Sequence, residues 1–128
     1  MRLLLDTHAF LWWLEGNRRL SKKARDAIGD ESNSVFVSAA SAWEITTKFR
    51  IGKLPGAAEI VGDIPGIVAS QAFSPLPITL VHAQRAGSLP GAHRDPFDRM
   101  LVAQAQTEDL VLVTNEKLFD NYGVRRLW

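Results

Sequence analysis

The chain has 128 residues, 46% of them hydrophobic, and a formal net charge of +1, values typical of one globular domain over residues 1–128. It has no cysteine and three histidines, which excludes disulfides and thiolate zinc sites and leaves oxygen as the main ligand for any metal. The longest apolar run, residues 9–14, is far shorter than the roughly 20 residues that cross a bilayer, and the first residues do not match a secretory signal. We therefore expect a cytoplasmic protein without membrane contact.

Short apolar runs alternate with segments of helical periodicity along the whole chain. In chain order, the expected elements are a strand at 2–5, helices at 7–14 and 21–29, a strand at 35–37, a helix from 38 or 41 to about 51, a helical region at 57–71, a strand at 73–78, helices at 79–86 and 95–107, a strand at 110–113, a turn with a short helix at 114–120 and a strand at 124–127. This alternation predicts an α/β fold with a mainly parallel sheet.

Prolines and glycines restrict two of these segments. Gly62 and Pro65 interrupt the helical pattern after the second strand, so this region can divide into two short pieces. Pro75 and Pro77 cannot donate to a strand ladder, so the third strand is expected at an edge of the sheet.

Four acidic residues follow the expected strands or lie early in the helices. They are Asp6, Glu44, Asp98 and Glu116. Ligands of open α/β sheets bind at the carboxyl ends of the strands, and carboxylates that meet there suit hard divalent cations. Such ions can supply a nucleophilic water and neutralise a phosphate. The pattern therefore predicts a metal-dependent phosphodiester hydrolase.

Each of the first three acids also has a structural interpretation. Asp6 can cap the first helix, Glu44 can pair with Lys48 four residues later, and Asp98 can stabilise its helix dipole. Asp95 precedes a proline and is better placed to cap that helix. We therefore assign Asp95 to capping first and to the site second, and Asp98 to the site.

Several short motifs occur in order along the chain, and they carry a resemblance to a known family. The motifs are LLDTH at 4–8 with WWL at 12–14, VSAASAWEI at 37–45, GKL at 52–54, HRDPFDR at 93–99 and TNEKLF at 114–119. Together they resemble the PIN-domain family, and more closely the VapC-like toxins of bacterial toxin–antitoxin modules. The resemblance spans nearly the whole chain.

The resemblance implies a three-layer α/β/α fold, endoribonuclease activity that depends on Mg²⁺ or Mn²⁺, a cognate antitoxin and a homodimer. The first three acids of the family match Asp6, Glu44 and Asp98. The fourth is usually an aspartate two residues after a threonine that closes a strand. Thr114 matches that threonine, so Glu116 holds the place of the acid with a side chain one methylene longer. This substitution would alter a second-metal site, while the first-metal site need not be altered.

The implied mechanism is in-line attack on an RNA phosphodiester by a metal-activated water. Asp6 and Asp98 would be the core metal ligands, Glu44 would bind directly or through water, and Glu116 would hold a second ion or orient the water. Candidate RNA contacts are Thr7, Arg94, Arg99 and Thr114. Thr7 can instead cap a helix, the two arginines can be ordinary surface charges, and His93 is open to either role.

The first helix is apolar on every face over residues 9–14. One face can join the core, and a second apolar face suggests a partner or a deeply buried helix. We therefore expect contacts with the antitoxin through Phe10, Trp12 and Trp13, although both tryptophans can equally belong to the core.

Two other functions are compatible with parts of this pattern. A phosphatase that forms an aspartyl-phosphate also begins with an apolar strand ending in aspartate, but it usually has a second acid two residues later, where this chain has His8. A catalytically weak PIN-like module that binds RNA or a protein partner is the second alternative, which the glutamate at the fourth position leaves open. The sequence does not identify the RNA target.

Overall fold

The computed structural model describes residues 1–91 and 93–128. Its elements in chain order are β1 (Arg2–Leu5), α1 (Thr7–Glu15), α2 (Lys22–Gly29), β2 (Ser34–Ser38), α3 (Ala39–Arg50), the 3₁₀ helix η1 (Pro55–Ala57), α4 (Ile64–Ser70), β3 (Ser74–Leu76), α5 (Leu80–Ser88), α6 (Pro96–Glu108), β4 (Val111–Val113), the 3₁₀ helix η2 (Lys117–Tyr122) and β5 (Arg126–Leu127).

The five strands form one sheet in the order β3-β2-β1-β4-β5, and every neighbouring pair is parallel. In the central ladder, Leu4 pairs with Phe36 of β2 on one side and with Leu112 of β4 on the other. The strand order changes direction between β1 and β4, because the chain first builds β2 and β3 on one side and then crosses to the other. The α/β class with a parallel sheet is confirmed, and β3 lies at an edge as its prolines predicted.

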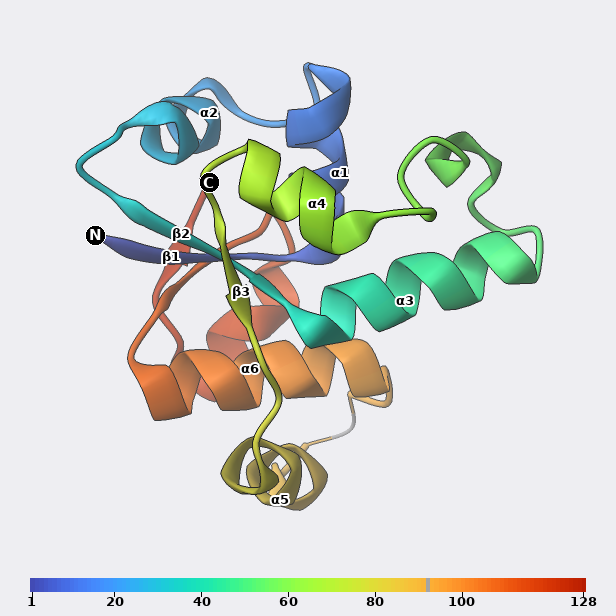
Figure 1. Ribbon diagram of the computed structural model, residues 1–128. Coiled ribbons are helices and arrows are strands. Elements are labelled where there is room, and N and C mark those ends of the chain that lie inside the picture. Colours follow the sequence, from blue (N-terminus) through green and yellow to red (C-terminus); the bar gives the residue numbers. More distant parts are fainter. Residues whose placement is uncertain (92) are drawn as a thin grey trace.

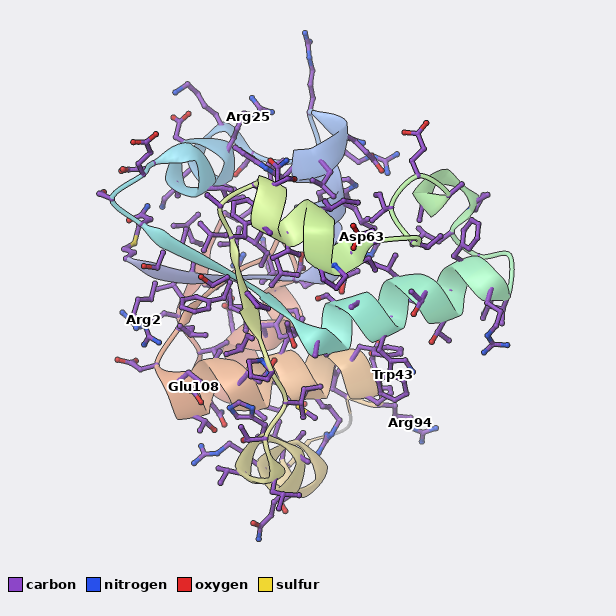
Figure 2. The ribbon with its side chains drawn as sticks, in the orientation of Figure 1. Arg2, Arg25, Trp43, Asp63, Arg94 and Glu108 are labelled. Atoms are coloured by element: carbon purple, nitrogen blue, oxygen red, sulfur yellow. The ribbon has the colours of Figure 1, made fainter. Side chains whose placement is uncertain are left out.

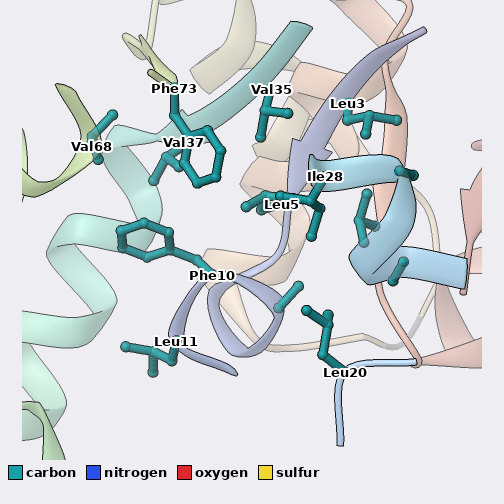
Figure 3. Packing of buried hydrophobic residues seen from close by; sticks show 14 of the residues in the cluster. Leu3, Leu5, Phe10, Leu11, Leu20, Ile28, Val35, Val37, Val68 and Phe73 are labelled. Atoms are coloured by element: carbon teal, nitrogen blue, oxygen red, sulfur yellow. The ribbon is translucent and has the colours of Figure 1, made fainter. Parts of the chain in front are cut away.

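Helices cover both faces of the sheet, which gives the three-layer arrangement (Figure 1). Side chains alternate between the faces of a strand, so Leu3 and Leu5 join one core with residues of α1, α2 and α4, while Leu4 joins another with residues of α6. Figure 3 shows the first core, where Phe10 of α1 packs beneath the sheet residues. Because both faces are buried, β1 is apolar throughout its last three residues.

The helical region expected at 57–71 is divided, as its glycine and proline residues allowed. η1 ends at residue 57, and α4 begins only at Ile64. The Asp63 side chain caps α4 by accepting from the Gly66 amide at 3.0 Å, and Pro65 occupies the first turn, where its missing N–H costs nothing. Among the described residues, no helix has both the length and the apolarity needed to cross a bilayer. The cytoplasmic location stays a prediction.

Candidate metal and catalytic site

The change of strand direction between β1 and β4 brings Asp6 and Thr114 together at the carboxyl edge of the sheet. The Asp6 amide donates to the Val113 carbonyl at 3.1 Å, which continues the pairing of the two strands. The Asp6 carboxylate is 5% exposed and accepts from the Ala9 amide at 2.7 Å, so it caps α1. One carboxylate oxygen serves this cap. Asp6 can therefore cap α1 with one carboxylate oxygen and still offer the other oxygen to a ligand at the end of β1.

Burial raises the pKa of Asp6, and the nearby charge of Glu116 raises it further. Hydrogen bonds from Thr114 and from the Ala9 amide act in the opposite direction. Glu116 itself is exposed, and its amide donates to the Thr114 hydroxyl at 3.0 Å. Glu116 thus lies beside Asp6 as its place in the sequence predicted, but on the solvent side.

Glu44 is fixed on α3 by two neighbours and is 5% exposed. The Thr7 hydroxyl donates to Oε1 at 2.5 Å, and the Lys48 ammonium donates to Oε2. The predicted pair of Glu44 with Lys48 is present. It leaves the Glu44 carboxylate close to Thr7 and near the charge of Asp98. Thr7 is also buried, so the structure makes it an orienting partner of Glu44 and not a contact at the rim.

Asp98 lies in the first turn of α6 beside two other titratable residues. Asp95 caps this helix by accepting from the Phe97 and Asp98 amides at 2.9 and 3.2 Å, in agreement with its assigned role. His93 Nε2 lies 2.9 Å from Asp98 Oδ2. Burial raises the pKa of Asp98 to about 6, together with the charges of Asp95 and Glu44, while the hydrogen bond to His93 opposes this shift.

Lys48 links the acids of α3 and α6. Burial lowers the pKa of its ammonium, but contact with Glu44 and the charges of Asp95 and Asp98 outweigh this effect and raise the pKa above its ordinary value. The carboxylates on these two helices therefore already attract a cation. Sequence reasoning treated Lys48 only as a competing explanation for Glu44, although the spacing of four residues was the signal for its position.

The donor chemistry of these groups fits a hard divalent cation. Within residues 1–91 and 93–128, however, no three carboxylate or imidazole side chains are arranged to hold an ion together. The acids form two groups instead. Asp6 lies with Glu116, and Glu44 lies with Asp95 and Asp98 around Lys48. Burial and, to a lesser degree, neighbouring carboxylates raise the pKa values of Asp6 and Asp98, and a divalent cation would offset both effects by favouring the charged form.

Of the three candidate RNA contacts other than Thr7, Arg99 and Thr114 are not placed to meet RNA at the rim. Arg99 donates to the backbone carbonyls of Ala86, His93 and Leu89, so its guanidinium ties the preceding loop to α6. This interpretation replaces the predicted phosphate contact. Thr114 is fully buried, which removes it from the rim, whereas Arg94 is exposed and projects outward (Figure 2).

The predicted antitoxin contacts on α1 need one correction. Phe10 is 0% exposed and belongs to the core, so it cannot touch a partner. Trp12 and Trp13 are half-buried. Trp12 packs on Trp128, and Trp13 donates from Nε1 to Gln71 at 3.0 Å. An all-apolar helix does not indicate which face is inward, which is why the sequence failed to separate Phe10 from its neighbours.

The chain belongs to the PIN-domain family, because the model of this domain matches residues 3–124. Ribonuclease VapC16 of Mycobacterium tuberculosis (strain ATCC 25618 / H37Rv) is 34% identical to this chain over 76 residues, which are 58% of this chain and 54% of that protein. The chain thus matches about half the length of this curated relative.

Solved structures of other proteins share the fold. VapBC2 from Rickettsia felis, bound to a DNA fragment from its promoter, gives a TM-score of 0.72 at 15% identity over 98% of this chain and 97% of that chain. VapC20 of Mycobacterium tuberculosis, a sarcin-ricin loop cleaving toxin, gives 0.68 at 13% identity over 95% of each chain. At these identities the likeness establishes the α/β/α fold.

Proposed function

We propose that this chain is a metal-dependent endoribonuclease that acts as the toxin of a toxin–antitoxin pair. The observation that carries the proposal is the raised pKa of two buried or half-buried aspartates that each have a further acid nearby, Asp6 beside Glu116 and Asp98 beside Asp95 and Glu44. Thr7, which follows Asp6, donates to Glu44 at 2.5 Å and so links the two groups of acids. Membership of the PIN-domain family and the similarity to a ribonuclease support the same activity. An α/β sheet binds its ligands at the carboxyl edge, where Asp6 lies.

Asp6 and Asp98 are the residues that would hold Mg²⁺ or Mn²⁺, with Glu44 as a further oxygen ligand, directly or through water. The ion, when bound, would activate a water and neutralise charge on the phosphate. Glu116 would orient this water or hold a second ion, and the exposed Arg94 would contact an RNA phosphate.

The remaining site residues prepare these carboxylates for binding. Thr7 and Lys48 hold the two oxygens of Glu44 from opposite sides, and the α1 amide of Ala9 holds one oxygen of Asp6. Fixed carboxylates need little rearrangement when they bind a cation, and this preorganisation strengthens binding.

The activity test compares RNA cleavage with Mg²⁺ or Mn²⁺ against EDTA, using purified protein and a structured RNA pool. Asp6→Asn is the informative variant, because asparagine caps a helix as well as aspartate does and the fold should survive. Glu108→Gln, at the far end of α6, is a matched control that removes one carboxylate outside the site. Metal-dependent cuts that disappear only in Asp6→Asn support the proposal. Cuts that persist in EDTA or in Asp6→Asn contradict it.

The partner would be an antitoxin that covers the outer side of α1 at Trp12 and Trp13. One similar solved structure is a toxin–antitoxin complex from Klebsiella pneumoniae, with a TM-score of 0.61 at 23% identity. Trp12→Ala should weaken antitoxin binding while changing the melting temperature little, because Trp12 is only half-buried. A large fall in melting temperature would instead assign Trp12 to the core through its contact with Trp128. The homodimer and the RNA target stay predictions without an assigned surface or sequence.

A further inference from the structure

A cavity of about 560 Å³ lies beside Asp98, between the loop that precedes α6 and the 3₁₀ helix η2. The described residues that line it are Pro90, Gly91, His93, Leu118, Asn121 and Tyr122. Its volume falls in the range of small-ligand sites, roughly 300–1,000 Å³. None of the roles assigned above to the carboxylates uses this cavity.

His93 forms the wall that the cavity shares with the acidic site. Its Nε2 lies 2.9 Å from Asp98 Oδ2, and its ring packs edge-on against Phe119 with the centroids 6.3 Å apart. Phe119 is buried in the core. The imidazole is therefore held from two sides, and a ligand in the cavity would lie one side chain away from Asp98.

The opposite wall is formed by the end of η2. The Tyr122 carbonyl accepts from the Gln106 side chain at 3.0 Å, which ties this turn to α6. Gly91 has a φ of +94°, and a Cβ there would lie 3.4 Å from the Tyr122 hydroxyl. A side chain at this position would be strained by the positive φ, and its Cβ would already contact the tyrosine, so a larger side chain would enter this side of the cavity.

The lining combines surfaces that suit the flat face of a nucleobase with groups that suit its hydrogen-bonding edge. Tyr122 and the half-exposed Leu118 offer an aromatic and an apolar surface, on which bases stack. The exposed Asn121 has one acceptor and two donors on its amide, which match the edge of a base. The exposed cations Arg94 and Lys117 are sequence neighbours of lining residues and favour a phosphate backbone at the margin.

We propose that this cavity holds one unstacked base of the RNA substrate, next to the phosphate that is cleaved, and that Asn121 reads the edge of this base. The inference rests on the proposed ribonuclease function and adds a source of sequence preference to it. A base held at His93 would place the adjoining backbone at Asp98.

The first test maps the ends of RNA fragments produced from a pool by the wild type and by Asn121→Ala. We expect the preference at one nucleotide beside the cut to fall about tenfold, which corresponds to the loss of one base-edge contact. Melting temperature and Mn²⁺ affinity should not change, because Asn121 is exposed and lies outside the acidic groups. Gln84→Ala removes an exposed amide from α5 and is the matched control. An unchanged preference in Asn121→Ala would overturn the proposal.

The second test does not depend on cleavage. Asp6→Asn protein is crosslinked by light to RNA that contains 4-thiouridine, and the attached peptide is identified. We expect crosslinks within residues 117–122, and their loss in a double variant that also carries Gly91→Val. Crosslinks in this segment without any metal-dependent cleavage would support base binding while rejecting the nuclease function. Crosslinks confined to other segments would overturn the base site and leave the nuclease function standing.

Discussion

The two ends of α6 treat their acidic residues differently. At the C-terminal end, Glu108 lies 2.8 Å from His82 Nε2, and Asp109 lies 3.0 Å from Arg125. At the N-terminal end, Asp95 and Asp98 lie near each other and near Glu44, and burial and these charges raise the pKa of Asp98 to about 6. Figure 2 shows Glu108 at one end of the helix and Arg94 at the other. Thirteen helical residues separate these ends by about 20 Å.

The contrast runs against the helix dipole, which by itself favours acids at the N-terminus by about 0.3–1 kcal/mol. Acids at both ends have basic partners, since His93 lies 2.9 Å from Asp98 and Lys48 pairs with Glu44. The N-terminal end, however, also brings several buried or half-buried carboxylates close to one another. Burial and like charges outweigh the dipole at Asp98, since its pKa is raised. Crowded carboxylates without full compensation are typical of a site that binds a cation, whereas the paired acids at the other end contribute to the fold.

The largest expected effect is on activity. Asp98→Asn should reduce RNA cleavage by on the order of a hundredfold or more, because it removes a proposed metal ligand. Glu108→Gln should leave the rate within about threefold, since its partner His82 lies far from the site. Initial rates at saturating Mg²⁺ would check both values. Comparable losses in the two variants would mean that the ends of α6 do not differ in function.

The second largest expected effect is a loss of folding stability when Arg99 is replaced. Arg99→Met should lower the free energy of unfolding by about 2–3 kcal/mol, because charged hydrogen bonds to three carbonyls are lost. Arg125→Met, which removes the exposed pair at the other end, should cost at most about 1 kcal/mol. Urea denaturation would compare them. Equal costs would show that the loop before α6 does not depend on Arg99.

Metal binding should stabilise the folded protein through the acids at the N-terminal end of α6 and not through those at its C-terminal end. Mg²⁺ at about ten times its dissociation constant should raise the free energy of unfolding by about 1.4 kcal/mol, and EDTA should reverse the effect. Asp98→Asn should lose most of this gain, and Glu108→Gln should keep it. Thermal shifts across a metal titration would measure it. An equal shift in Asp98→Asn would exclude that residue as a ligand.

The smallest effect is a dependence of stability on pH in the absence of metal. Folded Asp98 keeps its proton up to about pH 6, whereas the unfolded chain releases it near pH 4, so the folded state binds more protons in this window. The free energy of unfolding should therefore fall as the pH rises through the window and stay lower above it. Asp98→Asn should be more stable than the wild type at pH 7 by about 1 kcal/mol, a value reduced by partial exposure. Urea denaturation at a series of pH values would measure both proteins. If the free energies of unfolding of the wild type and of Asp98→Asn changed in parallel with pH, Asp98 would not be the source of the pH dependence.

Much of the sheet could be predicted from the sequence, because short apolar runs define strands, whereas the roles of Asp6, Glu44 and Asp98 as site residues stay predictions. Asp6 follows such a run directly. The roles of Thr7 and Arg99 could not be predicted, since they depend on burial and on backbone carbonyls brought close by the fold. The cavity beside His93 was equally hidden, because Gly91 and Tyr122 meet only in three dimensions.

The outer strand β3 has a further consequence for how copies of this chain can assemble. An exposed strand edge invites another chain to add a strand, which leads to aggregation. Pro75 lies within β3 and has no N–H to offer, and β5 at the opposite edge has only two residues. Both edges are therefore poor templates for a further strand. A homodimer of this chain is thus not expected to extend the sheet across its two subunits.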